Sequence, residues 1–174
     1  MPRFAQQRQK PPTPLERPRE LIVACAPMRS NVNLSRIVRT AGCTGVRQVI
    51  CCGTARIIDK IARDSVDDNE GDGDSAVEIR VHRTLPGPLK ELKAQGYQLV
   101  ALEQTTGSHS LFDFAFARRT VLVLGNERQG LDEQVLDLVD HAVEVPVYGR
   151  PASYNVATAA AMALYEFCRQ FPRG

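Results

Sequence analysis

The chain has 174 residues, of which 43% are apolar and 24% charged, with a formal net charge of +2. This length predicts one compact domain with its own hydrophobic core, and the composition excludes the collagen-like, coiled-coil and disordered classes. The apolar runs are too short for a membrane span, and the charged, proline-rich N-terminus is unlike a secretory signal. Five cysteines without metal-ligand spacing predict reduced thiols in a cytoplasmic protein, with no metal site.

The first predicted segment, residues 1–19, is a basic, proline-rich N-terminal arm. It contains five prolines and five basic residues against one acidic residue, Glu16. Two interpretations stay open at this point, a solubilising disordered tail and an arm that contacts phosphate groups.

Residues 20–174 form the second predicted unit, in which short β-branched runs alternate with amphipathic stretches. This alternation predicts an α/β domain with a mainly parallel sheet. The expected strands are Leu21–Ala26, Val46–Cys52, Val77–His82, Tyr97–Leu102, Thr120–Leu124 and Ala142–Val145. The expected helices are one around Leu34–Ala41 capped by Asn31 or Asn33, then Ile57–Ser65, Gly87–Gln95, a short helix after Gly130, and Ser153–Gln170.

An acidic stretch, Asp64–Glu78, invites a comparison with calcium-binding loops. Counted from Asp68, the glycine of such a loop falls correctly on Gly73, but Ile79 stands where a bidentate glutamate is required. The stretch is therefore interpreted as a solvated acidic loop.

Three segments carry more polar and special residues than a core requires, and each lies where an expected strand ends. In open α/β sheets this edge binds ligands. The segments are 31–41 (NVNLSRIVRTA), 121–131 (VLVLGNERQGL) and 145–156 (VPVYGRPASYNV).

Taken singly, these segments have structural explanations. Gly125 allows close approach of backbone to a ligand, but neither a Walker nor a Rossmann phosphate pattern is present around it. Ser153 is a good helix cap, and no nucleophile elbow supports a serine hydrolase. Glu127, at the centre of the second segment, is harder to explain structurally.

Together and in this order, the three segments closely resemble the signature motifs of the SpoU family of RNA ribose 2′-O-methyltransferases, within the SPOUT superfamily. Asn33 and Arg39 lie six residues apart as in the first motif, 122–131 looks like the second, and 145–147 with 153–157 looks like the third. The resemblance covers residues 20–170. Two departures are Tyr154, where the family usually has leucine, and Ser35, where it often has glycine.

The resemblance implies a parallel sheet with helices on both faces and a C-terminal deep trefoil knot that binds S-adenosylmethionine. It also implies an RNA partner, either tRNA or rRNA, and a homodimer whose active site is completed across the interface. The cofactor-binding residues that it implies are Leu102, Thr105, Gly125, Val145, Pro146 and Tyr154. The catalytic residues that it implies are Asn33, Arg39, Glu127, Ser153 and Asn155.

Methyl transfer from a sulfonium is an in-line displacement, so the protein mainly supplies alignment and a more nucleophilic ribose oxygen. Because an arginine ordinarily stays protonated, we expect Arg39 to hold a phosphate and the 2′-oxygen rather than to act as a base. Asn33 and Glu127 would orient Arg39, and Ser153 and Asn155 would contact substrate or cofactor.

Two other classes of function remain as alternatives. One is a non-catalytic RNA-binding protein on the same scaffold, and the other is an unrelated nucleotide-binding α/β enzyme, which the missing phosphate motifs disfavour. RNA contacts outside the site would come from basic side chains that bind phosphate without reading sequence. The candidates are Arg8, Lys10, Arg17, Arg19 and Arg150.

Overall fold

The computed structural model describes residue 4 and residues 10–53 and 77–174. Within these residues the strands are β1 (Leu21–Cys25), β2 (Gln48–Cys52), β3 (Glu78–His82), β4 (Gln98–Leu102), β5 (His109–Ser110), β6 (Thr120–Leu124) and β7 (His141–Glu144). The helices are α1 (Asn31–Cys43), α3 (Pro86–Ala94), α4 (Glu133–Leu136) and α5 (Val156–Gln170). The helix expected at Ile57–Ser65 and most of the acidic stretch lie outside the described residues.

The described strands form one sheet in the order β3-β2-β1-β6-β4-β7-β5, and every neighbouring pair runs parallel. The central strands β1 and β6 are buried at every position, as expected for a parallel sheet covered on both faces. The predicted parallel α/β fold is therefore confirmed. The trefoil knot stays a prediction of the family resemblance.

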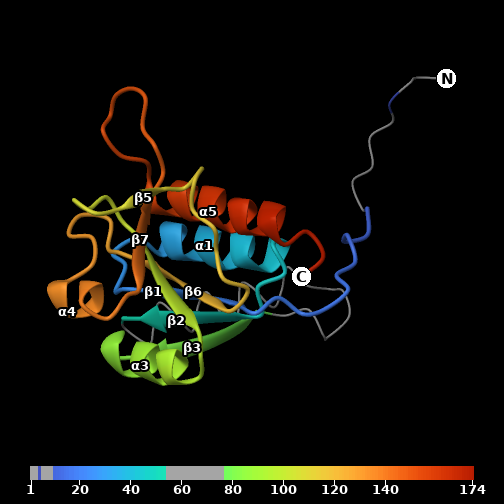
Figure 1. The fold of residues 1–174 in the computed structure, drawn as a ribbon, viewed down its shortest axis with the longest axis horizontal. Helices are drawn as coiled ribbons and strands as arrows, with labels where there is room; N and C mark the ends of the chain where they lie inside the picture. Colours follow the sequence, from blue (N-terminus) through green and yellow to red (C-terminus); the bar gives the residue numbers. More distant parts are fainter. Residues whose placement is uncertain (1–3, 5–9, 54–76) are drawn as a thin grey trace.

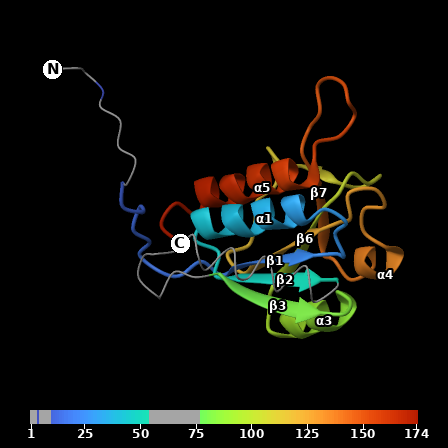
Figure 2. The same cartoon turned by 180° about the vertical axis from the view of Figure 1, so that it is seen from behind.

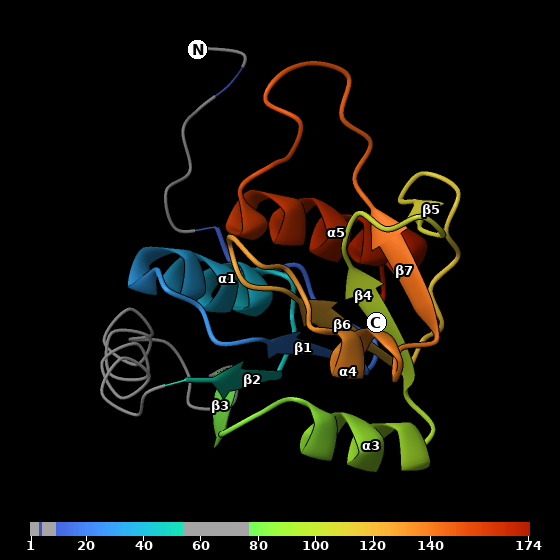
Figure 3. The same cartoon turned by 90° about the vertical axis from the view of Figure 1, so that its left-hand side faces the viewer.

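Side chains of successive strand residues enter different cores, because they point to opposite faces of the sheet. Val23 of β1 packs with α1 and α5, whereas Ile22 and Ala24 pack with α3 and α4. Figure 3 shows the resulting three layers, and Figures 1 and 2 show α1 and α5 lying side by side. Three of the five alanines of α5, namely Ala157, Ala160 and Ala163, are buried in the core on this face of the sheet.

Most expected boundaries agree with the structure, but two helix starts and one strand differ. The N-cap of α1 is Ser30, whose hydroxyl accepts the Asn33 amide hydrogen, rather than Asn31 or Asn33. Helix α5 begins at Val156 with Asn155 as its cap, so Ser153 lies in the preceding loop and not in the first turn. The strand β5 was not expected, because two residues are too short to show a period.

The end of the predicted N-terminal arm lies against the C-terminus. Arg19 is buried, at 9% exposed, and its Nη1 donates to the carbonyl oxygen of Phe171 at 2.6 Å. The Glu16 amide donates to the Arg173 carbonyl at 2.9 Å, and the two side chains form an ion pair. The prediction that Arg19 contacts RNA phosphate is therefore wrong, because its side chain is buried and already bonded to Phe171. The domain boundary at residue 19 stays a prediction.

Three of the five cysteines, Cys25, Cys51 and Cys52, are buried, and none of the five is in a disulfide. Burial raises the pKa of the Cys52 thiol to about 11. No helix among the described residues is both long enough and apolar enough to cross a membrane.

Candidate functional site

The ends of four neighbouring strands bring the three polar segments to one edge of the sheet. Cys25 of β1 and Leu102 of β4 both pair with Leu124 of β6, and Leu102 also pairs with Val143 of β7. Because the strands are parallel, their following loops leave from the same edge. The segment between β7 and α5 extends beyond the sheet there (Figure 1).

Glu127 is the centre of the hydrogen bonding at this edge. Its carboxylate accepts the backbone amides of Arg29 and Ser30, each at 3.0 Å. It also accepts the side-chain amide of Asn33 at 3.1 Å. One carboxylate therefore joins the loop after β6 to the first turn of α1, where amide groups are left without helical partners.

Asn33 carries this connection onward to the third segment. Its side-chain oxygen accepts the Asn155 side-chain amide at 3.1 Å, and the Asn155 oxygen accepts the Ala157 amide at 2.9 Å. The direction of every bond is fixed, since a carboxylate only accepts at one end and a backbone N–H only donates at the other. Two hydrogen bonds between residues 94 and 122 positions apart in the sequence thus join the three segments in one polar chain.

The same contacts control the ionisation of Glu127. Desolvation by burial alone would raise the pKa of its carboxyl, but hydrogen bonds from the Arg29, Glu127 and Ser30 amides and from Asn33 outweigh it. The pKa of Glu127 therefore lies below its ordinary value, and the carboxylate is charged at neutral pH.

Gly125 and Gly130 are required by a tight turn in the second segment. Their neighbour Asn126 exchanges two backbone hydrogen bonds with Gly130, at 2.9 and 3.0 Å, and Gly130 has a φ of +67°. A Cβ on Gly125 would lie 2.6 Å from the Gly130 carbonyl carbon and 2.9 Å from Glu103 Oε2. In the structure, Gly125 therefore makes room for protein atoms. The role expected for it in cofactor binding stays a prediction.

The other residues expected at the cofactor surround this turn. Leu102 ends β4, while Val145 and Pro146 follow β7, and all three are only partly buried. Thr105 lies in a turn closed by the Ser108 hydroxyl, which donates to the Thr105 carbonyl at 2.9 Å. Tyr154 is 40% exposed and immediately precedes the Asn155 cap.

Arg39 and Ser153 are both exposed, unlike the buried Asn33. Arg39 is exposed on α1, and helix geometry places its Cα roughly 9 Å along the axis from Asn33 and about 120° around it. Ser153 is exposed in the loop before α5. Glu127 and Asn33 form hydrogen bonds to each other, and they also bond to backbone amides and to Asn155. The expectation that they orient Arg39 stays a prediction.

The resemblance included Glu103 and Gln104 only within a stretch, Leu102 through Thr105, that was expected to close the cofactor pocket, and it predicted no contact for either. Glu103 Oε2 accepts the Leu131 amide at 3.1 Å, and Gln104 Nε2 donates to the Ala152 carbonyl at 3.3 Å. Both residues follow β4 directly, so the strand-end rule that pointed to the other three segments applies to them too.

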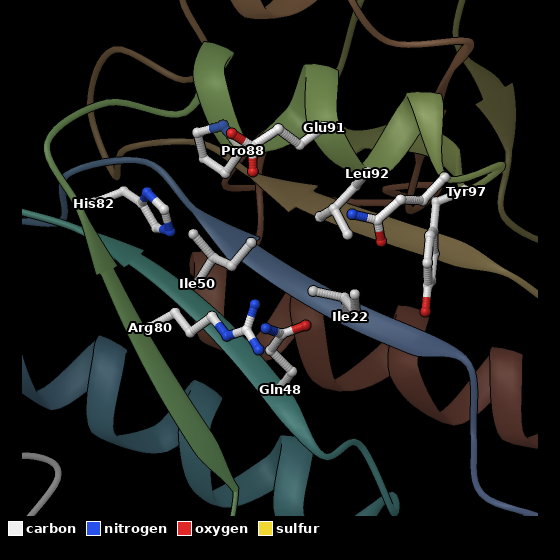
Figure 4. A pocket seen from close by; sticks show the side chains of 10 residues that line it. Ile22, Gln48, Ile50, Arg80, His82, Pro88, Glu91, Leu92 and Tyr97 are labelled. Atoms are coloured by element: carbon white, nitrogen blue, oxygen red, sulfur yellow. The ribbon is translucent and has the colours of Figure 1, made fainter.

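A hollow lies away from this edge, on the face of the sheet that α3 covers. Figure 4 shows its lining, in which Ile22 and Ile50 of the sheet and Leu92 of α3 contribute apolar side chains among polar ones. Its volume is about 210 Å³. Arg80 at its rim is already ion-paired with Glu78 at 3.0 Å. None of the expected site residues lines this hollow. In the described parts of the chain, no three His, Cys, Asp or Glu side chains are grouped to hold a metal.

The fold and the polar chain define a parallel α/β protein with a candidate ligand site at the carboxyl edge of its sheet. The chain belongs to the SpoU rRNA methylase family, whose family model matches residues 20–165.

Relatives and solved structures agree with this membership. The chain is 29% identical over 151 residues to the tRNA (guanosine(18)-2′-O)-methyltransferase of Escherichia coli, covering 87% of this chain and 64% of that enzyme. It is 30% identical over 158 residues to the enzyme of that name from Aquifex aeolicus, covering 89% and 72%. The crystal structure of the SpoU methyltransferase AviRb from Streptomyces viridochromogenes with AdoMet superposes with a TM-score of 0.76 at 27% identity, covering 91% and 63%. The chain thus spans less than two thirds of the E. coli enzyme.

Proposed function

We propose that this chain transfers a methyl group from S-adenosylmethionine to a ribose 2′-hydroxyl of tRNA or rRNA. The observation that carries the proposal is the chain of hydrogen bonds from Glu127 through Asn33 to Asn155. It joins the three segments that resemble the family motifs at the edge where parallel sheets bind ligands. The names of the E. coli and A. aeolicus relatives favour tRNA.

The residues at this edge fit the cofactor. Leu102, Val145 and Pro146 leave apolar surface partly uncovered where the loops after β4, β6 and β7 meet, which suits a flat adenine ring. The backbone of Gly125 and Tyr154 would supply polar contacts beside them, and Thr105 would close the pocket. When bound, S-adenosylmethionine supplies an electrophilic methyl group on a positively charged sulfur.

The protein's part in the reaction is positioning. The new bond joins the ribose 2′-oxygen to the methyl carbon, the sulfur–carbon bond breaks, and the hydroxyl proton leaves to solvent or to the adjacent phosphate. The planar Arg39 guanidinium would hold that phosphate and the 2′-oxygen in line with the methyl group. Glu127, Asn33 and Asn155 would keep the three segments in register, and the exposed Ser153 would contact the substrate.

We also propose a homodimer through the outer layer formed by α1 and α5. Met162 and Tyr165 lie on one face of α5 and are 37% and 74% exposed, and Val32 on α1 is 58% exposed. Exposed apolar side chains on neighbouring helices are typical of an interface. Because Arg39 is exposed on α1, a second copy packed against this layer would let it complete a site across the interface.

The dimer predicts a measurable change on replacing Tyr165 with glutamate. Because the Tyr165 side chain is mostly exposed in one chain, the variant should fold, yet it should sediment as a monomer where the parent chain sediments as a dimer. Lys90→Glu on the far α3 face is the control for added negative charge. A parent chain that sediments as a monomer at tens of micromolar would contradict the proposal.

RNA would contact exposed basic residues around the site, such as Arg29, Arg128 and Arg150. Lys10 and Arg17 of the N-terminal arm remain candidates, while Arg8 lies outside the described residues. We assign the protein to the cytoplasm, where such an RNA substrate is available.

Cofactor titration separates this proposal from the non-catalytic alternative. Calorimetry of the purified chain should show saturable binding of S-adenosylmethionine with about one site per chain. A pure RNA-binding protein on this scaffold should bind RNA without the cofactor. Absence of cofactor binding by a folded sample would reject the proposed function.

A further inference from the structure

Two adjacent residues at the end of β4 each reach a different loop of the candidate site. The Glu103 carboxylate accepts the Leu131 amide at 3.1 Å, at the end of the turn that carries Glu127. The Gln104 side chain donates to the Ala152 carbonyl at 3.3 Å, in the loop that leads to Asn155. The Glu103 backbone amide meanwhile donates to Val143 of β7 at 3.0 Å.

The Glu103 carboxylate occupies space that two glycines, Gly125 and Gly130, leave open. A Cβ on Gly130 would lie 2.5 Å from Glu103 Oε2, and a Cβ on Gly125 would lie 2.9 Å from the same atom. A side chain at either position would displace the carboxylate or the turn. The two glycines thus serve both the tight turn and a charge-assisted hydrogen bond to the Leu131 amide.

The turn between these glycines also carries Glu127. A displacement of Gly130 moves Asn126, to which it is joined by two backbone hydrogen bonds, and Glu127 is the next residue. Glu127 in turn holds the first residues of α1. Glu103 is therefore linked to α1 through a short series of hydrogen-bonded groups.

From these contacts we infer that Glu103 and Gln104 are positioning residues, which hold the loop after β6 and the loop after β7 in the arrangement that binds S-adenosylmethionine. The inference rests on the proposed function, because it assumes that the cofactor lies where these loops meet. Neither side chain needs to contact the reacting atoms. Their effect should fall on cofactor affinity more than on the chemical step.

The test compares four variants of the full chain by calorimetry with S-adenosylmethionine, by steady-state kinetics and by thermal melting. Glu103→Ala should weaken cofactor binding about tenfold and raise the KM for the cofactor more than it lowers kcat. Glu103→Gln should recover part of the affinity, because its amide oxygen can still accept the Leu131 N–H. Gln104→Ala should weaken binding roughly threefold, since one neutral hydrogen bond is lost. Gln134→Ala, exposed on α4, is the control and should be unchanged.

Amide hydrogen exchange of the cofactor-free protein provides a second readout. Glu103→Ala should speed exchange at Leu131 and Gly130 relative to the parent and to Gln134→Ala. If the parent binds the cofactor while Glu103→Ala and Gln104→Ala bind it equally well, the inference is wrong and the proposed function stands. If the parent binds none, the proposed function fails with it. Should Glu103→Ala not fold, the affinities of Glu103→Gln and Gln104→Ala for the cofactor decide the question. Parental affinity in both variants would then contradict the inference.

Discussion

Replacing Arg39 by lysine is expected to lower turnover roughly 100-fold while leaving cofactor affinity unchanged. Lysine keeps the positive charge but loses the planar fork that could hold a phosphate and a ribose oxygen together. Arg39 lies on the exposed side of α1, whereas Asn33 on the same helix makes the hydrogen bonds to Glu127 and Asn155. The folded core and the cofactor loops should therefore be preserved in the variant.

The measurement is methyl transfer to RNA under single-turnover conditions, together with calorimetry for the cofactor. Arg83→Lys, an exposed arginine after β3, provides the matched control and should keep parental turnover. Near-parental methylation by Arg39→Lys would remove Arg39 from the reaction. Loss of cofactor binding in the same variant would instead assign it to the pocket.

The second large effect is expected for Asn33→Asp. Asn33 is 7% exposed, and its side-chain amide lies 3.1 Å from Glu127 Oε1, where the substitution places a second carboxylate. Two carboxylates at this distance repel, and the donor to Glu127 is lost. We expect the free energy of unfolding at neutral pH to fall by about 3 kcal/mol, with loss of most activity.

The pH dependence of stability tests whether repulsion between two carboxylates causes the loss in Asn33→Asp. In the parent, the pKa of Glu127 in the folded state lies below its value in the unfolded chain, which is about 4.3. Its contribution to the free energy of unfolding is therefore fully present above about pH 4.3 and is lost as the pH falls through the lower folded-state pKa. In Asn33→Asp, repulsion raises the pKa of one of the two carboxyls, so the stability deficit should shrink as the pH falls through that raised value. Asn33→Ala should show no such recovery in the same range.

Thermal melting between pH 7 and pH 4 provides the measurement. Asn31→Asp is the matched control, because Asn31 is exposed in the first turn of the same helix, where a carboxylate is favourable. It should melt at or slightly above the parental temperature. A deficit in Asn33→Asp that does not depend on pH would contradict the assigned polar chain.

The sequence predicted the parallel sheet well because the buried strands show it directly. Thr120–Leu124 is apolar throughout after its first residue and agrees with β6 at both ends. Helix starts were harder, since Ser30, Asn31 and Asn33 are all good capping residues, as are Ser153 and Asn155. Only the side-chain hydrogen bonds in the structure distinguish them, and these depend on where Glu127 arrives from a distant strand.

The resemblance predicted a set of site residues but not their hydrogen bonds, and the roles of those residues stay predictions. Glu127, Asn33 and Asn155 do come together, as the resemblance implies, yet the sequence could not show that they bond mainly to one another and to backbone amides. Nor could it show that Arg19 is buried against Phe171, because that contact joins opposite ends of the chain. Glu103 fell within the stretch expected to close the cofactor pocket, but its contacts could not be predicted, because they depend on the fold bringing Gly125 and Gly130 around it.

The most direct test of the account locates the transferred methyl group. RNA from cells deleted for this chain would be incubated with the purified protein and S-adenosylmethionine labelled in its methyl group, then digested to nucleosides and analysed by mass spectrometry. We predict label on the ribose of one nucleoside, with a neighbouring phosphodiester that resists alkaline cleavage because its 2′-hydroxyl is blocked. Label confined to a base, or cofactor binding with no transfer to any RNA, would contradict the account.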